Sequence, residues 1–148
     1  MEDILLITPP FTQLNTPYPA TAYLKGFLNT KNINSHQMDL GIEVILQLFS
    51  KQGLENIFDY VHQKEILLTE NSERIYALKE YYISSIDAVI LFLQGKNQTF
   101  SRQICTDDFL PQAARFKTLD DLEWAFGNMG LQDKAKHLAT LYLEDLSD

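Results

Sequence analysis

A run of apolar residues that ends on two prolines most limits what this chain can fold into. Residues 4–8 read Ile-Leu-Leu-Ile-Thr, and Pro9 and Pro10 follow at once. A continuous apolar run of this length predicts a strand buried on both faces, as in a parallel sheet. Pro17 and Pro19 lie just beyond, so a stiff loop is expected directly after the strand.

A helix and a second strand are predicted after this loop. Apolar residues at helical spacing indicate a helix from Pro17 or Tyr18 to about Thr30. Thr16 is its expected N-cap. Residues 33–40 alternate in the way of a weaker strand. A strand, a helix and a strand in this order predict a βαβ unit with parallel strands and a right-handed crossover.

Helices are expected over most of the remaining chain. Helical stripes start near Ile42 and near Gly53, and a third stripe runs unbroken over residues 71–95, where Gly95 is the expected end. Residues 86–93 also fit a third strand, but the continuous stripe favours a helix. The residues from Leu131 onward predict the last helix.

The domain organisation that follows is an α/β start and a helical remainder. Residues 1–52 are interpreted as a βαβ, Rossmann-like start of a doubly wound domain, and residues 53–148 as a helical subdomain. A sheet of two strands is marginal by itself. We therefore expect helices, another chain or additional polypeptide to complete it.

Composition excludes several classes of function. The net charge of −8 argues against a nucleic-acid-binding face and against attraction to anionic membranes. The chain has one cysteine, Cys105, so neither an intrachain disulfide nor a cysteine metal cluster can form. The acidic N-terminus lacks the basic region of a signal peptide, and no apolar run is long enough to cross a bilayer. A cytoplasmic protein is expected.

The loop of residues 9–17 is the candidate site, because ligands of open parallel sheets lie beyond the carboxyl ends of the strands. Hydrogen-bonding side chains there are those of Thr12, Gln13, Asn15 and Thr16. The same loop could be a plain connector. It has no glycine, so it is neither a dinucleotide fingerprint nor a phosphate-binding P-loop. Asp39 could bind a ribose, or it could cap a turn or helix.

The remaining reactive side chains favour structural roles. His36, His62 and His137 lack the spacing of metal ligands, so no metal site is predicted. Cys105 lies close to Asp107 and Asp108, whose charges should raise the pKa of the thiol, which favours a buried structural role. The remaining acidic pairs also favour structural roles. Residues 120–121 are interpreted as the start of a helix, and residues 144–145 as part of a solvated face. The aromatic side chains of Phe116, Trp124 and Phe126 are interpreted as core.

The first third of the chain resembles the start of cobalamin-binding-type domains in radical S-adenosylmethionine enzymes. The resemblance lies in a strand that ends in Thr8-Pro9-Pro10, a helix that follows Pro19, and a second strand that ends in Asp39-Leu40. The rest of the chain, with "FLPQAARF" among its segments, looks like a helical insertion found in one subgroup of these enzymes.

This resemblance implies that the chain is the N-terminal part of such an enzyme, inactive alone and without catalytic or metal-binding residues of its own. A parent polypeptide would supply a [4Fe–4S] cluster and S-adenosylmethionine, with or without cobalamin. Thr12, Asn15, Thr16 and Tyr18 are the residues expected to face cofactor or substrate. The three-cysteine cluster motif and the D-x-H-x-x-G motif for an axial histidine do not occur here. The partner expected is thus the remainder of the parent chain.

A second hypothesis is a stand-alone helical interaction module that forms a homodimer. Its exposed sheet edges would favour pairing with another copy. A third and weaker hypothesis is a small-molecule sensor of the flavodoxin-like kind, which would need three further strands.

Overall fold

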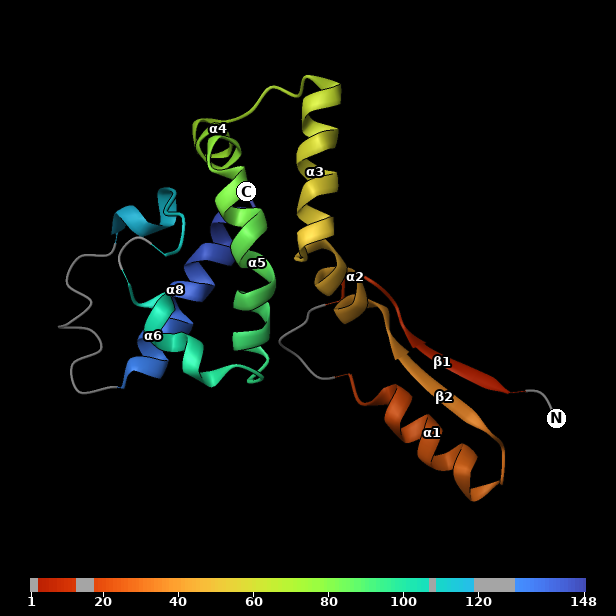
Figure 1. Ribbon diagram of the computed structural model, residues 1–148. Helices are drawn as coiled ribbons and strands as arrows, with labels where there is room; N and C mark the ends of the chain where they lie inside the picture. Colours follow the sequence, from red (N-terminus) through yellow and green to blue (C-terminus); the bar gives the residue numbers. More distant parts are fainter. Residues whose placement is uncertain (1–2, 13–17, 107–108, 119–129) are drawn as a thin grey trace. The chain divides into compact units, whose positions relative to one another are not determined.

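The structure, a computed structural model, describes residues 3–12, 18–106, 109–118 and 130–148. It divides into two compact units, Met1–Leu48 and Phe49–Asp148 (Figure 1). The first unit holds a parallel pair of strands, and the second is helical in its described residues. The expected α/β start followed by a mostly helical region is confirmed at this level.

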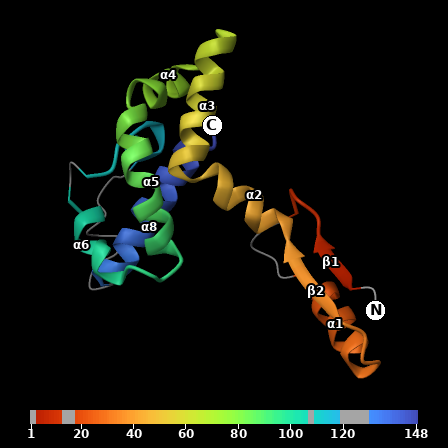
Figure 2. The same ribbon diagram turned by 45° about the vertical axis from the view of Figure 1, so that its right-hand side comes forward.

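The first unit is a βαβ arrangement followed by one helix. Its elements are β1 (Ile4–Thr8), α1 (Ala20–Thr30), β2 (Ser35–Asp39) and α2 (Leu40–Leu48). The strands β1 and β2 run parallel, with Ile4 opposite Ser35 and Thr8 opposite Asp39. Both predicted strands are therefore confirmed, the second with shorter bounds. Figure 2 shows α1 alongside the two strands.

Helix α1 begins later than its sequence predicts. The expected start at Pro17 or Tyr18 is wrong, since the first helical residue is Ala20 and Pro19 holds the N-cap position. The Pro19 carbonyl accepts the hydrogen bond from the Tyr23 backbone N–H at 2.9 Å. Pro19 has no N–H of its own to leave unpaired, and its φ of −76° suits the first turn of a helix; no side chain caps this end of α1. The expected N-cap, Thr16, lies outside the described residues.

The side of α1 that faces the sheet carries polar Thr21 and Lys25 together with Leu28. The Gln37 side chain donates a hydrogen bond to Thr21 Oγ1 at 3.1 Å. The Lys25 ammonium donates to the Ser35 carbonyl oxygen at 3.0 Å. By contrast, Tyr23 is 77% exposed and Phe27 is 59% exposed. Two strands thus leave much of the predicted apolar stripe of α1 without cover.

The second unit is built from α-helices and two short 3-10 helices. Their bounds are α3 (Lys51–Lys64), α4 (Glu70–Ala77), α5 (Lys79–Leu93), η1 (Gln98–Phe100), α6 (Ser101–Ile104), η2 (Ala114–Thr118) and α8 (Leu131–Leu146). Hydroxyl side chains start two of them. Ser50 Oγ accepts the Gly53 N–H ahead of α3, and Thr69 Oγ1 accepts the Ser72 N–H ahead of α4.

The predicted unbroken helix over residues 71–95 is wrong, because it divides into α4 and α5 at Leu78. Leu78 leaves helical geometry (φ −98°, ψ 11°), and neither glycine nor proline marks the break in the sequence. Residues 86–93 are helical, as favoured. Gly95, with φ of 76°, ends α5 in a Schellman motif in which the Lys96 N–H reaches the Leu91 carbonyl.

One hydrophobic core holds the helical unit together. Helices α5 and α8 contribute most of it, and α3, α4, α6 and η2 close around them. Its fully buried large side chains are Tyr82, Ile86, Val89, Phe92, Ile104 and Tyr142. Phe116 also belongs to this core, as predicted, whereas Trp124 and Phe126 lie outside the described residues.

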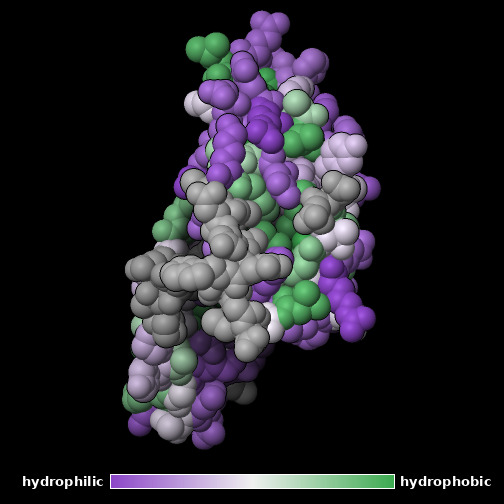
Figure 3. Space-filling model, turned by 90° about the vertical axis from the view of Figure 1, so that its left-hand side faces the viewer, coloured by the Kyte–Doolittle hydropathy of each residue, from purple (hydrophilic) through white to green (hydrophobic). Residues whose placement is uncertain are grey.

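Hydrophilic and hydrophobic side chains are both present on the surface. On the face turned to the viewer in Figure 3, outside the grey atoms, purple hydrophilic side chains alternate with smaller green patches. Among the described helices, none combines the length and the apolar character that crossing a membrane requires.

Candidate functional site

The carboxyl ends of β1 and β2 lie side by side at one end of the sheet. Thr8 and Asp39 are neighbours across the two strands, and a turn over Pro9–Thr12 follows β1 directly. We call Pro9–Thr12 together with Asp39 the carboxyl-end surface. In open parallel sheets this is where ligands bind.

Phe11 is the most unusual residue of the carboxyl-end surface. Its φ of 63° lies in the left-handed region, which is unfavourable for a side chain without a local hydrogen-bonding group. Its ring is 86% exposed. Beside it, Thr12 Oγ1 donates a hydrogen bond to the Pro9 carbonyl oxygen at 3.3 Å and closes the turn. The turn therefore exposes an aromatic ring to solvent at the carboxyl end of the sheet. The sequence analysis did not identify Phe11 as a candidate residue.

Asp39 is a helix cap. Its Oδ1 accepts the Ile42 backbone N–H at 3.1 Å, three residues on, where α2 begins. The capping interpretation of Asp39 is confirmed. This hydrogen bond fixes the direction in which α2 leaves the end of β2.

The other predicted contact residues are only partly placed. Tyr18 is 44% exposed and directly precedes the first turn of α1. Asn15 and Thr16 lie outside the described residues. Phe11 and Tyr18 offer flat aromatic faces, and Thr12 offers a hydroxyl oxygen. These groups suit contact with a flat, largely apolar ring.

The described residues hold no cluster of metal-binding side chains, and their one cysteine is Cys105. No set of three His, Cys, Asp or Glu side chains there could hold a metal ion. Cys105 is half-buried, and its Sγ lies 3.7 Å from the Leu131 carbonyl oxygen. Burial raises the pKa of the Cys105 thiol, and Lys134 partly offsets this. The expected direction is confirmed. Asp107 and Asp108 lie outside the described residues.

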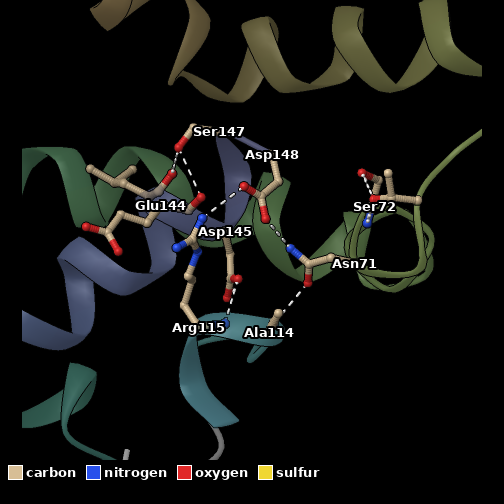
Figure 4. A network of polar contacts seen from close by, with 10 residues as sticks. Asn71, Ser72, Ala114, Arg115, Glu144, Asp145, Ser147 and Asp148 are labelled. Carbon is tan, nitrogen blue, oxygen red and sulfur yellow. Dashed lines mark hydrogen bonds and ion pairs between the residues drawn. The ribbon is translucent and has the colours of Figure 1, made fainter. Parts of the chain in front are cut away.

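A buried carboxylate, Asp145, organises the helical unit (Figure 4). Asp145 is 0% exposed, so its interpretation as part of a solvated face is wrong. Its Oδ2 accepts the Ala113 N–H at 3.1 Å, and its Oδ1 accepts the Arg115 N–H at 3.0 Å. Helical spacing contained the missing signal, because Asp145 follows Leu138 by seven residues and Tyr142 by three on the buried stripe of α8.

A second layer of polar contacts continues outward from this carboxylate. Asn71 Oδ1 accepts the Ala114 N–H at 2.9 Å, and Asn71 Nδ2 donates to the Asp148 carboxylate at 2.6 Å. Arg115 forms an ion pair with the same carboxylate at 3.1 Å. Figure 4 shows α4, η2 and the end of α8 joined by these bonds. The network satisfies backbone donors, so its role is to hold the fold.

Two buried tyrosines cross between α5 and α8. Tyr142 Oη donates to the Tyr82 carbonyl oxygen at 3.0 Å and lies 2.9 Å from Ser85 Oγ. Tyr82 Oη is buried and has no hydrogen-bond partner in the described residues. Burial raises the pKa of both tyrosines, and the charge of Asp145 raises that of Tyr82 further.

Removal of the hydroxyl group should have a different effect on stability at each of the two tyrosines. Tyr142→Phe is expected to lower the free energy of unfolding by about 1.5 kcal/mol, since it removes the buried hydrogen bonds that Tyr142 Oη makes with the Tyr82 carbonyl and with Ser85 Oγ. Tyr82→Phe removes an unpaired hydroxyl and should change stability by less than about 0.5 kcal/mol or increase it. Urea titrations followed by circular dichroism measure both values. Equal losses in the two variants would contradict this assignment.

Comparisons of the chain with protein-family models, with curated proteins and with solved structures find no match.

Proposed function

We propose that Met1–Leu48 is the opening βαβ unit of a Rossmann-like, cobalamin-binding-type domain in a radical S-adenosylmethionine enzyme. In this proposal the chain forms one wall of a cofactor or substrate cleft and is inactive alone. The observation that carries the proposal is the parallel pairing of β1 and β2, with the carboxyl-end surface beyond both strands. The sequence resemblance then names the class of enzyme.

The chemistry of the carboxyl-end surface agrees with this role in binding. Phe11 presents an exposed ring and Thr12 fixes the turn that carries it. When bound, cobalamin would supply methyl-group transfer chemistry, and additional polypeptide would supply the iron–sulfur cluster. Phe11 and Thr12 would contact the cofactor, since they offer an aromatic ring and a hydroxyl group.

Spectra of the natural polypeptide that carries this sequence test the proposal. After anaerobic purification from cells grown with cobalamin, we expect iron–sulfur and corrin absorbance, with iron and sulfide present on analysis. Iron–sulfur absorbance without corrin would retain the radical enzyme and remove cobalamin. The absence of both would refute the proposed class.

A matched pair of variants locates the binding surface. Phe11→Ala is expected to weaken corrin binding about tenfold, the effect of losing one aromatic contact. Phe27→Ala removes an exposed ring from the C-terminal half of α1, away from the carboxyl-end surface, and should leave corrin binding unchanged. Equal binding by both variants would exclude Phe11 from the cleft.

A dimerising interaction module is the second candidate, because apolar side chains of the sheet are exposed. Leu5 and Ile7 of β1 both stand open to solvent. Sedimentation equilibrium at several concentrations distinguishes the candidates. A reversible dimer with neither cofactor spectrum would favour the interaction module.

A further inference from the structure

A cavity lies between α4 and η2 in the helical unit. Its volume of about 340 Å³ falls in the range of sites for small molecules. All of the described residues that line it belong to the unit Phe49–Asp148. They are Thr69, Glu70, Asn71, Arg74, Ala114 and Lys117.

Hydrogen bonds hold the two walls of this cavity together. Asn71 Oδ1 of α4 accepts the Ala114 N–H of η2 at 2.9 Å (Figure 4). The buried Asp145 carboxylate accepts the backbone N–H groups of the residues on both sides of Ala114. Because η2 is fixed to α4 and α8 in this way, Lys117 of η2 lines the same cavity as Arg74 of α4.

The two cations of this cavity lack a carboxylate partner. In the described part of the chain, neither Arg74 nor Lys117 forms an ion pair or a side-chain hydrogen bond. Arg115, which is also on η2, differs because it forms an ion pair with Asp148 at 3.1 Å. Two positive charges that face one cavity repel each other, and an anion between them would relieve this repulsion. In a chain with a net charge of −8, this pairing indicates a site for a negatively charged group.

Glu70 is the acidic residue among those described around the cavity. It is the first residue of α4, where the helix dipole favours a carboxylate, so its position has a structural reason. Its negative charge offsets one of the two positive charges. Glu70 should therefore weaken the binding of an anion without preventing it.

A phosphoryl group fits these charges better than a carboxylate does. A phosphate monoester carries a charge of about −1.5 to −2 near neutral pH and has three acceptor oxygens. The Arg74 guanidinium can bind two oxygens as a fork, and the Lys117 ammonium can bind the third as a point charge. A carboxylate has two oxygens and one charge, and a single arginine satisfies it.

We propose that the cavity between α4 and η2 binds the phosphoryl group of a small molecule, with Arg74 on one wall and Lys117 on the other. Free inorganic phosphate shares this chemistry and is distinguished by experiment. This site goes beyond the proposed function and does not depend on it, because its residues all belong to the helical unit.

Nuclear magnetic resonance titrations of the 148-residue chain at low ionic strength test the site. The probes are phenyl phosphate, inorganic phosphate and benzoate. We expect phenyl phosphate to shift the amide signals of Asn71 and Ala114 with a Kd of about 1 mM, and benzoate to bind at least about tenfold more weakly. Equal affinity for the two phosphates would identify free phosphate as the ligand, whereas tighter binding of phenyl phosphate would identify an organic phosphate.

Four glutamine variants locate the charges that matter. Arg74→Gln is expected to weaken the binding of phenyl phosphate about tenfold, and Lys117→Gln about fivefold. Glu70→Gln should strengthen it about threefold, because a repulsive charge is removed. Arg102→Gln removes an exposed arginine of α6 that does not line the cavity, and should leave the affinity unchanged. All four side chains are exposed, so the variants should fold like the parent chain.

Three results would overturn the inference. They are the absence of shifts at Asn71 and Ala114, equal affinities for phenyl phosphate in Arg74→Gln and Arg102→Gln, and binding of benzoate as tight as that of phenyl phosphate. None of them would change the corrin and iron–sulfur spectra that test the proposed function. Conversely, a protein with neither spectrum that still binds phenyl phosphate through Arg74 would refute the enzyme class and support this site.

Discussion

Asp145→Ala is expected to lower the free energy of unfolding of the helical unit by about 3 kcal/mol. The carboxylate is fully buried and accepts the backbone N–H groups of Ala113 and Arg115. Hydrogen bonds to a charged group stabilise more than neutral ones, and removal of the acceptor leaves two donors without a partner. The deleted side chain also leaves a gap beside the core.

A graded series of variants separates these effects. Asp145→Asn keeps the size of the side chain but has one acceptor oxygen in place of two, so about 2 kcal/mol should be lost. Glu144→Ala removes the neighbouring exposed carboxylate of α8 and should change stability by less than about 0.5 kcal/mol. Urea unfolding followed by far-ultraviolet circular dichroism gives the three values. Equal small losses at positions 144 and 145 would show that the buried carboxylate does not hold η2.

Structural features that depend on the residues of a single helix or strand were predictable from the sequence. The five apolar residues of β1 defined a strand without reference to any partner, and the apolar stripe of α8 defined a helix. The Asp39 cap follows from its position just before α2. Such features depend on local geometry, which residue spacing records directly.

Features that depend on tertiary packing were not predictable. The break at Leu78 has no glycine or proline to announce it, because packing of α4 and α5 against one core decides where the helix divides. Asp145 looked like a surface acid because charged residues are rarely buried without partners, and its partners are backbone groups more than 25 residues away. The left-handed geometry of Phe11 likewise has no sequence signal, since glycine or asparagine is the residue expected there.

The candidate site shows the same division. The sequence located the loop after β1, because a parallel strand implies a ligand-facing end. It selected hydrogen-bonding side chains and passed over Phe11, whose exposure depends on the turn that Thr12 closes. The sequence also indicated that two strands are too few. In the described residues β1 pairs with β2 alone, and Lys25 donates a hydrogen bond to the Ser35 carbonyl oxygen of β2.

Raising the pH above about 10 is expected to destabilise the helical unit steeply, by about 1.4 kcal/mol per pH unit for each of Tyr82 and Tyr142. Burial raises the pKa of both phenols above the ordinary value of 10.0. Their protonated form is therefore favoured by folding. The stabilisation is complete below the unfolded pKa and declines as the pH rises from there toward the folded pKa, because the unfolded chain releases these protons first.

Unfolding midpoints in urea between pH 8 and about 11 measure this slope. Lysines also titrate in this range, so the informative quantity is the difference between variants. Tyr142→Phe and Tyr82→Phe should each make the decline shallower by about 1.4 kcal/mol per pH unit. Tyr23→Phe removes an exposed phenol from α1 and should leave the slope unchanged. The contradicting result is the same dependence of stability on pH in all three variants as in the unsubstituted chain. It would mean that folding does not raise the pKa of the two buried hydroxyls.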